Sequence, residues 1–310
     1  MRLIKETHIN FMGQRLTGYI LSGILILAGL ISLIVNSGPK LSIDFKGGTL
    51  VAVQFTQPIE ITDIRTALTN VNLAGQTFDF SQEEIKHFGD PTEISVRLPH
   101  QEDEPEDFAN QIVEYLYRSF PGKVPESTSN FILDIERVGP KIGSELSGKA
   151  FMAILSSLLL ILLYISVRFE FRFAVGAIAA LVHDVIITLG IFSLLGYEIS
   201  LSIIAAFLTI VGYSLNDTIV IFDRIREDMK INRREPFVNV VNTSINESLS
   251  RTIITSLTTF FVVLVLWLAG GEVIHNFAFA MIVGVVVGTY SSIFIASPIV
   301  VQFQKSIHKK

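Results

Sequence analysis

One carboxylate lies inside a long apolar run of this sequence. Asp217 belongs to the run 201–222, and Ser214, Asn216 and Thr218 flank it. An ionisable side chain within a membrane span is energetically costly, and such residues mark ion or proton paths with a partner elsewhere in the bundle. The pattern therefore predicts reversible proton binding at Asp217, and another part of the chain must supply the partner.

Arg251 is the partner that the sequence suggests. It stands at the start of the next apolar run, with Thr255 and Thr258 on the same helix face. Arginine keeps its proton, so Arg251 would be the fixed cation and Asp217 the titrating group. Two other interpretations stay open: a structural ion pair that holds two helices in register, or an Arg251 that extends to lipid phosphates.

His183 and Asp184 interrupt another apolar run near its middle. Histidine titrates near neutral pH and suits a proton relay. Adjacent residues point about 100 degrees apart on a helix, so these two side chains cannot face one partner. We favour a structural hydrogen-bonding role for them over direct proton transfer. The residues expected to support the Asp217 site are His183, Asp184, Asn216, Thr218 and Thr255.

The elements that must position these residues are membrane-spanning helices. Half of the 310 residues are hydrophobic, which is typical of an integral membrane protein. We expect six spans, the first of them an uncleaved anchor. The predicted organisation is an N-terminal segment (1–15), a first span (16–35), a folded domain (36–148), three spans (149–222), a connection with an amphipathic helix (223–250), two spans (251–303) and a C-terminal segment (304–310).

The distribution of basic residues predicts the orientation of these spans. The short turns at 196–200 and 270–275 contain no lysine or arginine, whereas the opposite connections and both termini are basic. By the positive-inside rule both termini and the 223–250 connection are cytoplasmic, and the 36–148 domain lies outside. Expected localisation is thus a bacterial cytoplasmic (inner) membrane, with one periplasmic domain.

The segment 36–148 is expected to be a small α+β domain. It carries nine basic and eighteen acidic side chains, so it is acidic while the rest of the chain is basic. Strand and helix patterns alternate in the order βαββαβ, which predicts a ferredoxin-like fold. The predicted strands are 49–55, 76–80, 93–98 and 131–138, and the predicted helices are 60–71 and 104–120. Gly47 and Gly48 are expected to form a turn or bulge into the first strand.

The connection 223–250 has apolar residues at helical spacing. They are Phe237, Val238, Val241, Ile245 and Leu249. This pattern fits a helix lying along the inner membrane surface, and equally an amphipathic helix packed on the bundle.

No enzyme signature accompanies these features. The chain has no cysteine, and we find no phosphate-binding glycine loop, metal-spaced histidine cluster or nucleophile motif. We expect no enzymatic activity, no cofactor, no metal and no nucleic-acid partner. An ion gradient is then the expected energy source, at about 2.3 kcal/mol per charge and 100 mV.

Five motifs in order resemble the SecD/SecF family, of the resistance-nodulation-division (RND) superfamily. They are Ile43–Thr49, Val138–Gly143, Leu181–Asp184, Gly212–Glu227 and Ser250–Ser256. The resemblance covers nearly the whole chain and implies half of an RND-type bundle that pairs with SecD. It also implies binding to the SecYEG channel with YajC, and use of the proton-motive force to export unfolded preproteins. The family's transmembrane acid and arginine fall on Asp217 and Arg251.

Two rival functions stay open. One is a proton-coupled drug or lipid exporter of the same superfamily, although those proteins usually carry both halves of the bundle in one chain. The other is a structural scaffold of the translocase, for which neutralising Asp217 would be harmless.

Overall fold

The computed structural model describes residues 7–73, 75–101, 104–105 and 107–307. The chain divides into two compact units, Leu41–Ala150 and the combination of Met1–Lys40 with Phe151–Lys310. We call them the sheet unit and the membrane unit.

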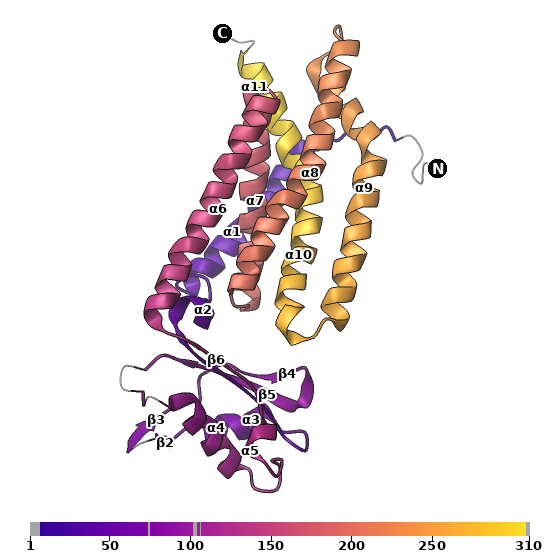
Figure 1. Cartoon of the computed structure of the whole chain (residues 1–310). Helices are drawn as coiled ribbons and strands as arrows, with labels where there is room; N and C mark the ends of the chain where they lie inside the picture. The colour runs from indigo at the N-terminus through magenta and orange to yellow at the C-terminus, as the bar shows by residue number, and fades with distance from the viewer. Residues whose placement is uncertain (1–6, 74, 102–103, 106, 308–310) are drawn as a thin grey trace. The chain divides into compact units, whose positions relative to one another are not determined.

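The sheet unit contains a four-stranded antiparallel sheet of order β4-β5-β1-β6. Its strands are β1 (Gly48–Gln54), β4 (Ile85–Phe88), β5 (Asp90–Pro99) and β6 (Ile132–Val138). The helices α3 (Ile61–Ala67) and α4 (Phe108–Ser119) share one apolar core with the sheet and cover one of its faces (Figure 1). The order and the two helices on one face confirm the ferredoxin-like prediction.

One strand of this unit was predicted at the wrong position in the sequence. The segment predicted as the second sheet strand, 76–80, forms β3 (Gln76–Phe78), which pairs with β2 (Val71–Leu73) in a separate hairpin. β4 takes its place in the sheet because Ile85 pairs opposite Val96 and fills the core. The helix predicted at 60–71 ends at Ala67, since β2 begins four residues later.

The Gly47–Gly48 pair makes the predicted turn into β1. It follows a short helix, α2 (Ile43–Lys46), whose N-terminus is capped by the Ser42 hydroxyl accepting from Asp44 N at 3.2 Å. Both glycines have positive φ, 78° and 145°. A Cβ on Gly47 would lie 2.9 Å from Pro140 Cα, so a side chain there is excluded by conformation and by space.

The membrane unit confirms the prediction of six spans. Within the described part of the chain, six helices are long and apolar enough to cross a membrane. They are α1 (Arg15–Val35), α6 (Pro140–Arg168), α7 (Phe171–Leu195), α8 (Leu201–Ile231), α9 (Phe237–Ala269) and a sixth formed by α10 (Glu272–Ser291), a π-helical turn (Ser292–Ala296) and α11 (Ser297–Ile307). A further four-residue helix, α5 (Thr128–Phe131), belongs to the sheet unit.

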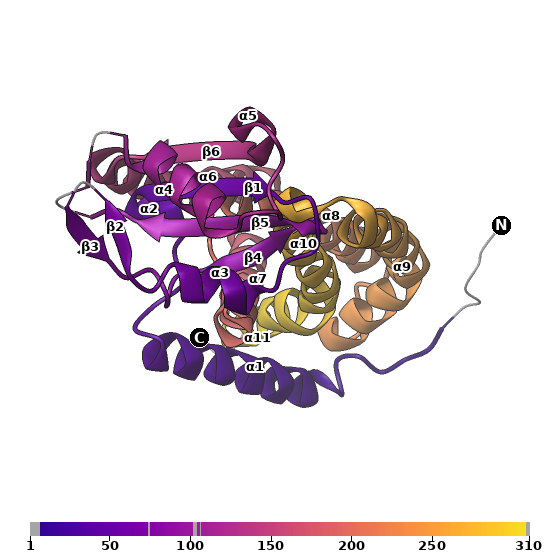
Figure 2. The same cartoon turned by 90° about the horizontal axis from the view of Figure 1, so that it is seen from below.

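α10 is the inner helix of the membrane unit. It packs against α7, α8 and α9, while α1 packs along α7 (Figure 2). Small residues permit this packing: a Cβ on Gly288 would lie 2.9 Å from the Cβ of Ser214 in α8. α6 by contrast exposes Phe151, Leu155 and Leu159, a surface suited to lipid or to another helix.

The connection 223–250 is not a separate surface helix. α8 continues to Ile231 and α9 begins at Phe237, so each span extends directly into this segment (Figure 1). No glycine or proline interrupts 237–269, and Val241 and Ile245 are buried in the core of the membrane unit. The alternative of an amphipathic helix packed on the bundle therefore describes the structure, because the apolar face covers protein rather than lipid.

The segment before α1 is held by two asparagines of α9. Asn246 accepts from Ile9 N at 2.9 Å and donates to Ile9 O at 2.8 Å. Asn242 accepts from Met12 N at 3.2 Å and donates to Ile9 O at 3.1 Å. We call this set of hydrogen bonds the asparagine clasp.

Candidate functional site

Asp217 lies in the interior of the membrane unit. Its residue is only 2% exposed, although α8 is otherwise a membrane span. The Ser256 hydroxyl donates to Asp217 Oδ2 at 3.1 Å, and the Thr255 hydroxyl donates to Oδ1 at 3.5 Å. Ser256 is also 2.6 Å from the Thr289 hydroxyl of α10. Asp217 is thus surrounded by neutral donors from α9 and, one bond further, α10.

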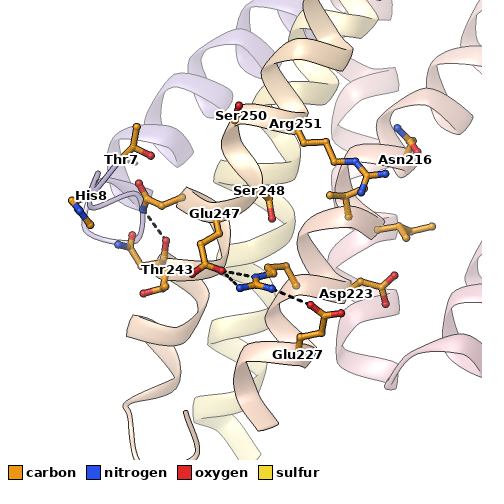
Figure 3. Close-up of a pocket in the computed structure, with 15 residues that line it drawn as sticks. Thr7, His8, Asn216, Asp223, Glu227, Thr243, Glu247, Ser248, Ser250 and Arg251 are labelled. Carbon is orange, nitrogen blue, oxygen red and sulfur yellow. Dashed lines mark hydrogen bonds and ion pairs between the residues drawn. The ribbon is translucent and has the colours of Figure 1, made fainter. Parts of the chain in front are cut away.

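Arg251 lies near this acid but does not pair with it. In the described part of the chain, the bonds to the Asp217 carboxylate come from hydroxyls, and no ion pair joins it to Arg251. The Arg251 side chain extends from α9 toward α8, where Asn216 lies (Figure 3). The expected close pair is therefore absent from this conformation, because Arg251 stands one turn of α9 before Thr255 and is exposed.

A polar cavity of about 910 Å³ separates α8 and α9 on this side of Asp217 (Figure 3). Asn216 and Arg251 line one part of it, and Asp223, Glu227 and Glu247 line another. A cavity with this many polar groups is roomy and polar enough to hold water. The cavity is therefore lined by a cation, Arg251, and by the amide of Asn216, the residue next to Asp217 in the chain.

The remaining predicted residues of α8 and α9 divide into two groups. Asn216 and Arg251 face the cavity, whereas Thr255 contacts the acid directly. The Thr218 residue is 1% exposed, and its hydroxyl has no hydrogen-bond partner among the described residues. Thr218 thus lies next to Asp217 in the chain without taking part in its hydrogen bonds.

His183 and Asp184 form a second buried polar group. His183 Nδ1 is 2.9 Å from Asp184 Oδ1, although the residues are adjacent on α7. Asp184 Oδ2 accepts from Ser214 of α8 at 2.6 Å and from Ser291 at 2.8 Å. Neither side chain contacts Asp217. As predicted, the pair faces different helices, but its members also bind each other.

A third buried acid was missed by the sequence analysis. Asp228 is 3% exposed, accepts from the Ser244 hydroxyl at 2.6 Å and pairs with Arg224 at 3.3 Å. Arg224 also pairs with Glu247. This cluster joins the ends of α8 and α9. The spacing of Arg224 and Asp228, four residues apart, would predict an ion pair on one helix face. It was overlooked because a loop was expected at 223–250.

Comparison with known proteins decides the family. The family model "Protein export membrane protein SecD/SecF, C-terminal" matches residues 123–306, and "SecD/SecF GG Motif" matches residues 32–59. A protein translocase subunit SecF from Calditerrivibrio nitroreducens is 46% identical over 100% of this chain and 99% of its own. Another from Rhodothermus marinus is 47% identical over 98% of this chain and 96% of its own.

The chain belongs to the SecD/SecF family. It is accordingly a multi-pass membrane protein of the protein-export machinery. In this SecD/SecF chain the matched GG motif contains the Gly47–Gly48 turn, and the longer match contains the three buried acids Asp184, Asp217 and Asp228.

Solved structures agree with the SecD/SecF assignment. The crystal structure of SecDF, a translocon-associated membrane protein from Thermus thermophilus, has a TM-score of 0.83 at 39% identity and covers 97% of this chain. SecDF in a super-membrane-facing form has a TM-score of 0.69 at 38% identity. The SecD/SecF chain described here spans only 39% and 40% of those two chains.

Proposed function

We propose that this chain pairs with a SecD subunit and uses the proton-motive force to promote preprotein export across the bacterial inner membrane. The SecDF chain to which it is similar is more than twice as long, so a second half is needed to complete the same unit. SecYEG, YajC and the emerging preprotein are the further partners of the proposal. Both termini are cytoplasmic in it, and the sheet unit is periplasmic.

The observation that carries the proposal is the environment of Asp217. A carboxylate 2% exposed in a span, held by the hydroxyls of Ser256 and Thr255, is stable in either protonation state. When it is ionised, each hydroxyl can turn its single hydrogen to the carboxylate, away from its shorter bond to Thr252 O at 2.9 Å or to Thr289 at 2.6 Å. When it binds a proton, one hydroxyl turns away and the acid itself becomes a donor. Neutral hydroxyls allow this exchange, whereas a permanent ion pair would hold the ionised form.

Arg251 supplies the electrostatic part of the cycle. It lines the polar cavity beside α8, free to approach Asp217 when the acid is ionised and to withdraw when it is neutral. Each cycle then moves α9 relative to α8. The membrane potential supplies about 2.3 kcal/mol per charge and 100 mV to drive this motion.

The test uses inverted membrane vesicles containing the complete translocase with this chain. We expect Asp217→Asn to abolish the dependence of preprotein export on the proton gradient, while the protein still inserts and assembles with SecD. Asp223→Asn is the matched control, because Asp223 is on the same helix and lines the same cavity, while its carboxylate is exposed and contacts Arg168 and Arg226 at 3.7 and 3.8 Å. Normal gradient-dependent export by Asp217→Asn would overturn the proposal and favour a scaffold.

A further inference from the structure

A continuous chain of hydrogen bonds runs from Asp184 to α1. His183 Nδ1 meets Asp184 Oδ1, and His183 Nε2 meets the Ser22 hydroxyl of α1 at 2.8 Å. Ser22 in turn is 3.0 Å from the Tyr290 hydroxyl of α10, which donates to the Gly18 carbonyl at 2.6 Å. Ser22, His183 and Asp184 are buried, and Tyr290 is partly buried.

The number of available hydrogens fixes the direction of each bond. The Gly18 carbonyl only accepts, so the single hydrogen of Tyr290 is used there. The bond between Ser22 and Tyr290 must then use the Ser22 hydrogen. Ser22 has no second hydrogen, so His183 Nε2 must carry a proton and donate it to Ser22.

One more proton lies between His183 and Asp184. With Nε2–H already in place, the Nδ1···Oδ1 bond needs its own hydrogen, either on the ring or on the carboxyl. Asp184 Oδ2 cannot supply it, because it accepts from Ser214 and Ser291. In both arrangements the two side chains together are neutral. The full hydrogen-bond chain therefore requires the proton-loaded state of the pair.

We propose that His183 and Asp184 form a second proton-binding site, separate from Asp217, whose state is transmitted to α1 and α10 through Ser22 and Tyr290. Loss of one proton to water leaves Nδ1–H donating to an ionised Asp184. Nε2 then has a lone pair, and Ser22 must rotate its hydrogen from Tyr290 to Nε2. The pair becomes singly negative, and the Ser22–Tyr290 bond between α1 and α10 is broken.

The groups that contact the pair are hydroxyls, so the proton is bound by His183 and Asp184 themselves. α1 presents Ser22, α8 presents Ser214, and α10 presents Ser291 and the titratable Tyr290. The π-helical turn has no ionisable residue. The nearest acid along α8 is Asp217, one turn beyond Ser214, with its own hydroxyl donors. Among the described residues no lysine or arginine contacts the pair.

The test follows the two ring nitrogens of His183 by nitrogen NMR. The full chain, labelled with ¹⁵N-histidine, is placed in lipid nanodiscs, and the His183 signals are those lost in His183→Gln. We expect Nε2 to be protonated at low pH. As pH rises within about pH 5 to 9, Nε2 loses its proton while Nδ1 keeps one. A ring with Nε2 unprotonated at every pH, or unchanged across this range, overturns the proposal.

Tyr290→Phe tests the transmission without removing either titrating group. It frees the Ser22 hydrogen for Nε2, so the transition should move to lower pH by about half to one unit, as expected for one hydrogen bond. Thr188→Val is the control, because the Thr188 hydroxyl donates to the backbone carbonyl of Asp184 and not to its carboxylate. If the midpoint pH of the His183 transition is unchanged in Tyr290→Phe, or shifts equally in the control, the proposed coupling through Ser22 and Tyr290 is wrong.

This site goes beyond the proposed function, and the two can fail separately. In Asp217→Asn, loss of gradient-driven export with an unchanged His183 transition supports two separate sites. A transition that disappears with Asp217 contradicts the second site. Normal export with an intact transition overturns the proposed function alone.

Discussion

Gly29 of α1 lies directly against Gly190 of α7. A Cβ built on Gly29 would be 2.7 Å from the Cα of Gly190, and one on Gly190 would be 2.8 Å from the Cα of Gly29. The close approach is backbone to backbone, so no side-chain rotation can relieve an added methyl group. The two glycines therefore set the distance between α1 and α7 about two helical turns from the contact of Ser22 with His183.

Gly29→Ala should separate these helices. Overpacking of this kind typically costs about 1–3 kcal/mol. We expect a lower unfolding temperature in detergent and faster amide exchange in α1. Gly23→Ala is the control on the same helix, because nothing lies within 4 Å of a Cβ there. Equal destabilisation by the two variants would show that α1 does not depend on this contact.

Ser256→Ala should impair gradient-driven export with little effect on assembly. It removes the nearer donor to Asp217, at 3.1 Å, and loss of a hydrogen-bond partner to a buried polar group costs about 1–3 kcal/mol. Export rates in vesicles, measured with and without a proton gradient, check this expectation. Thr258→Val removes a hydroxyl from the same helix that donates only to the Thr255 carbonyl, and should export normally. If Thr258→Val impaired gradient-driven export more than Ser256→Ala, Ser256 would have no part in the site.

Replacing Asn242 and Asn246 together with alanine should release the segment before α1. Each hydrogen bond contributes about 0.5–1.5 kcal/mol net, so the amides of Ile9 and Met12 should exchange at least about fivefold faster. Mass-spectrometric hydrogen exchange of residues 9–12 gives the readout. Asn239→Ala, an exposed asparagine of the same helix, should leave exchange unchanged. Unaltered protection in the double variant would mean that burial of Phe11 and Met12 holds the segment without the asparagine clasp.

Glu136 should make the sheet unit less stable as pH rises. Loss of hydration raises the pKa of its carboxyl, the charges of Asp134 and Asp44 add to this, and Arg97 opposes it. A raised pKa means that the folded state binds the proton more tightly, so this contribution is present below the ordinary pKa and is lost as pH rises through the raised value.

Glu136→Gln should remove the loss of stability that accompanies ionisation of this carboxyl as pH rises. Melting temperatures of the full chain in detergent should show a larger gain for the variant over the natural chain at about pH 7 than at about pH 4. The gain will be small, because the side chain keeps part of its surface in solvent. A variant that is less stable at neutral pH would contradict the direction of this shift.

Most of the architecture could be predicted from the sequence because it depends on local residue patterns. Six apolar runs and the alternation around β1 and β5 predict the spans and the sheet without knowledge of partners. β4 was missed because its four residues become a strand only through pairing with β5. The sequence predicts a connection at 223–250 because the apolar run of α8 ends there and that of α9 has not yet begun, whereas the helices themselves extend into this segment.

The site was predicted in part for a similar reason. Asp217 and His183 stand out because ionisable residues are rare in spans. The hydrogen-bond partners of the buried residues are ordinary hydroxyls from distant helices: Ser22 is 161 residues from His183, and Ser291 is 107 residues from Asp184. Nothing in the types of these residues separates them from other small polar residues in spans. The Asp217–Arg251 pair was inferred from distance along helices, which cannot specify the rotation that directs Arg251 toward the cavity.

The extended ends of α8 and α9 give the protein a stiff arm. α8 continues 14 residues past Asp217, which at 1.5 Å per residue is about 21 Å, and α9 is joined to it through Asp228 and Ser244. A tilt of ten degrees centred on the buried acid would move the tip by about 4 Å. Movement too small to disturb packing beside one carboxyl would thus be magnified at the far end of the hairpin.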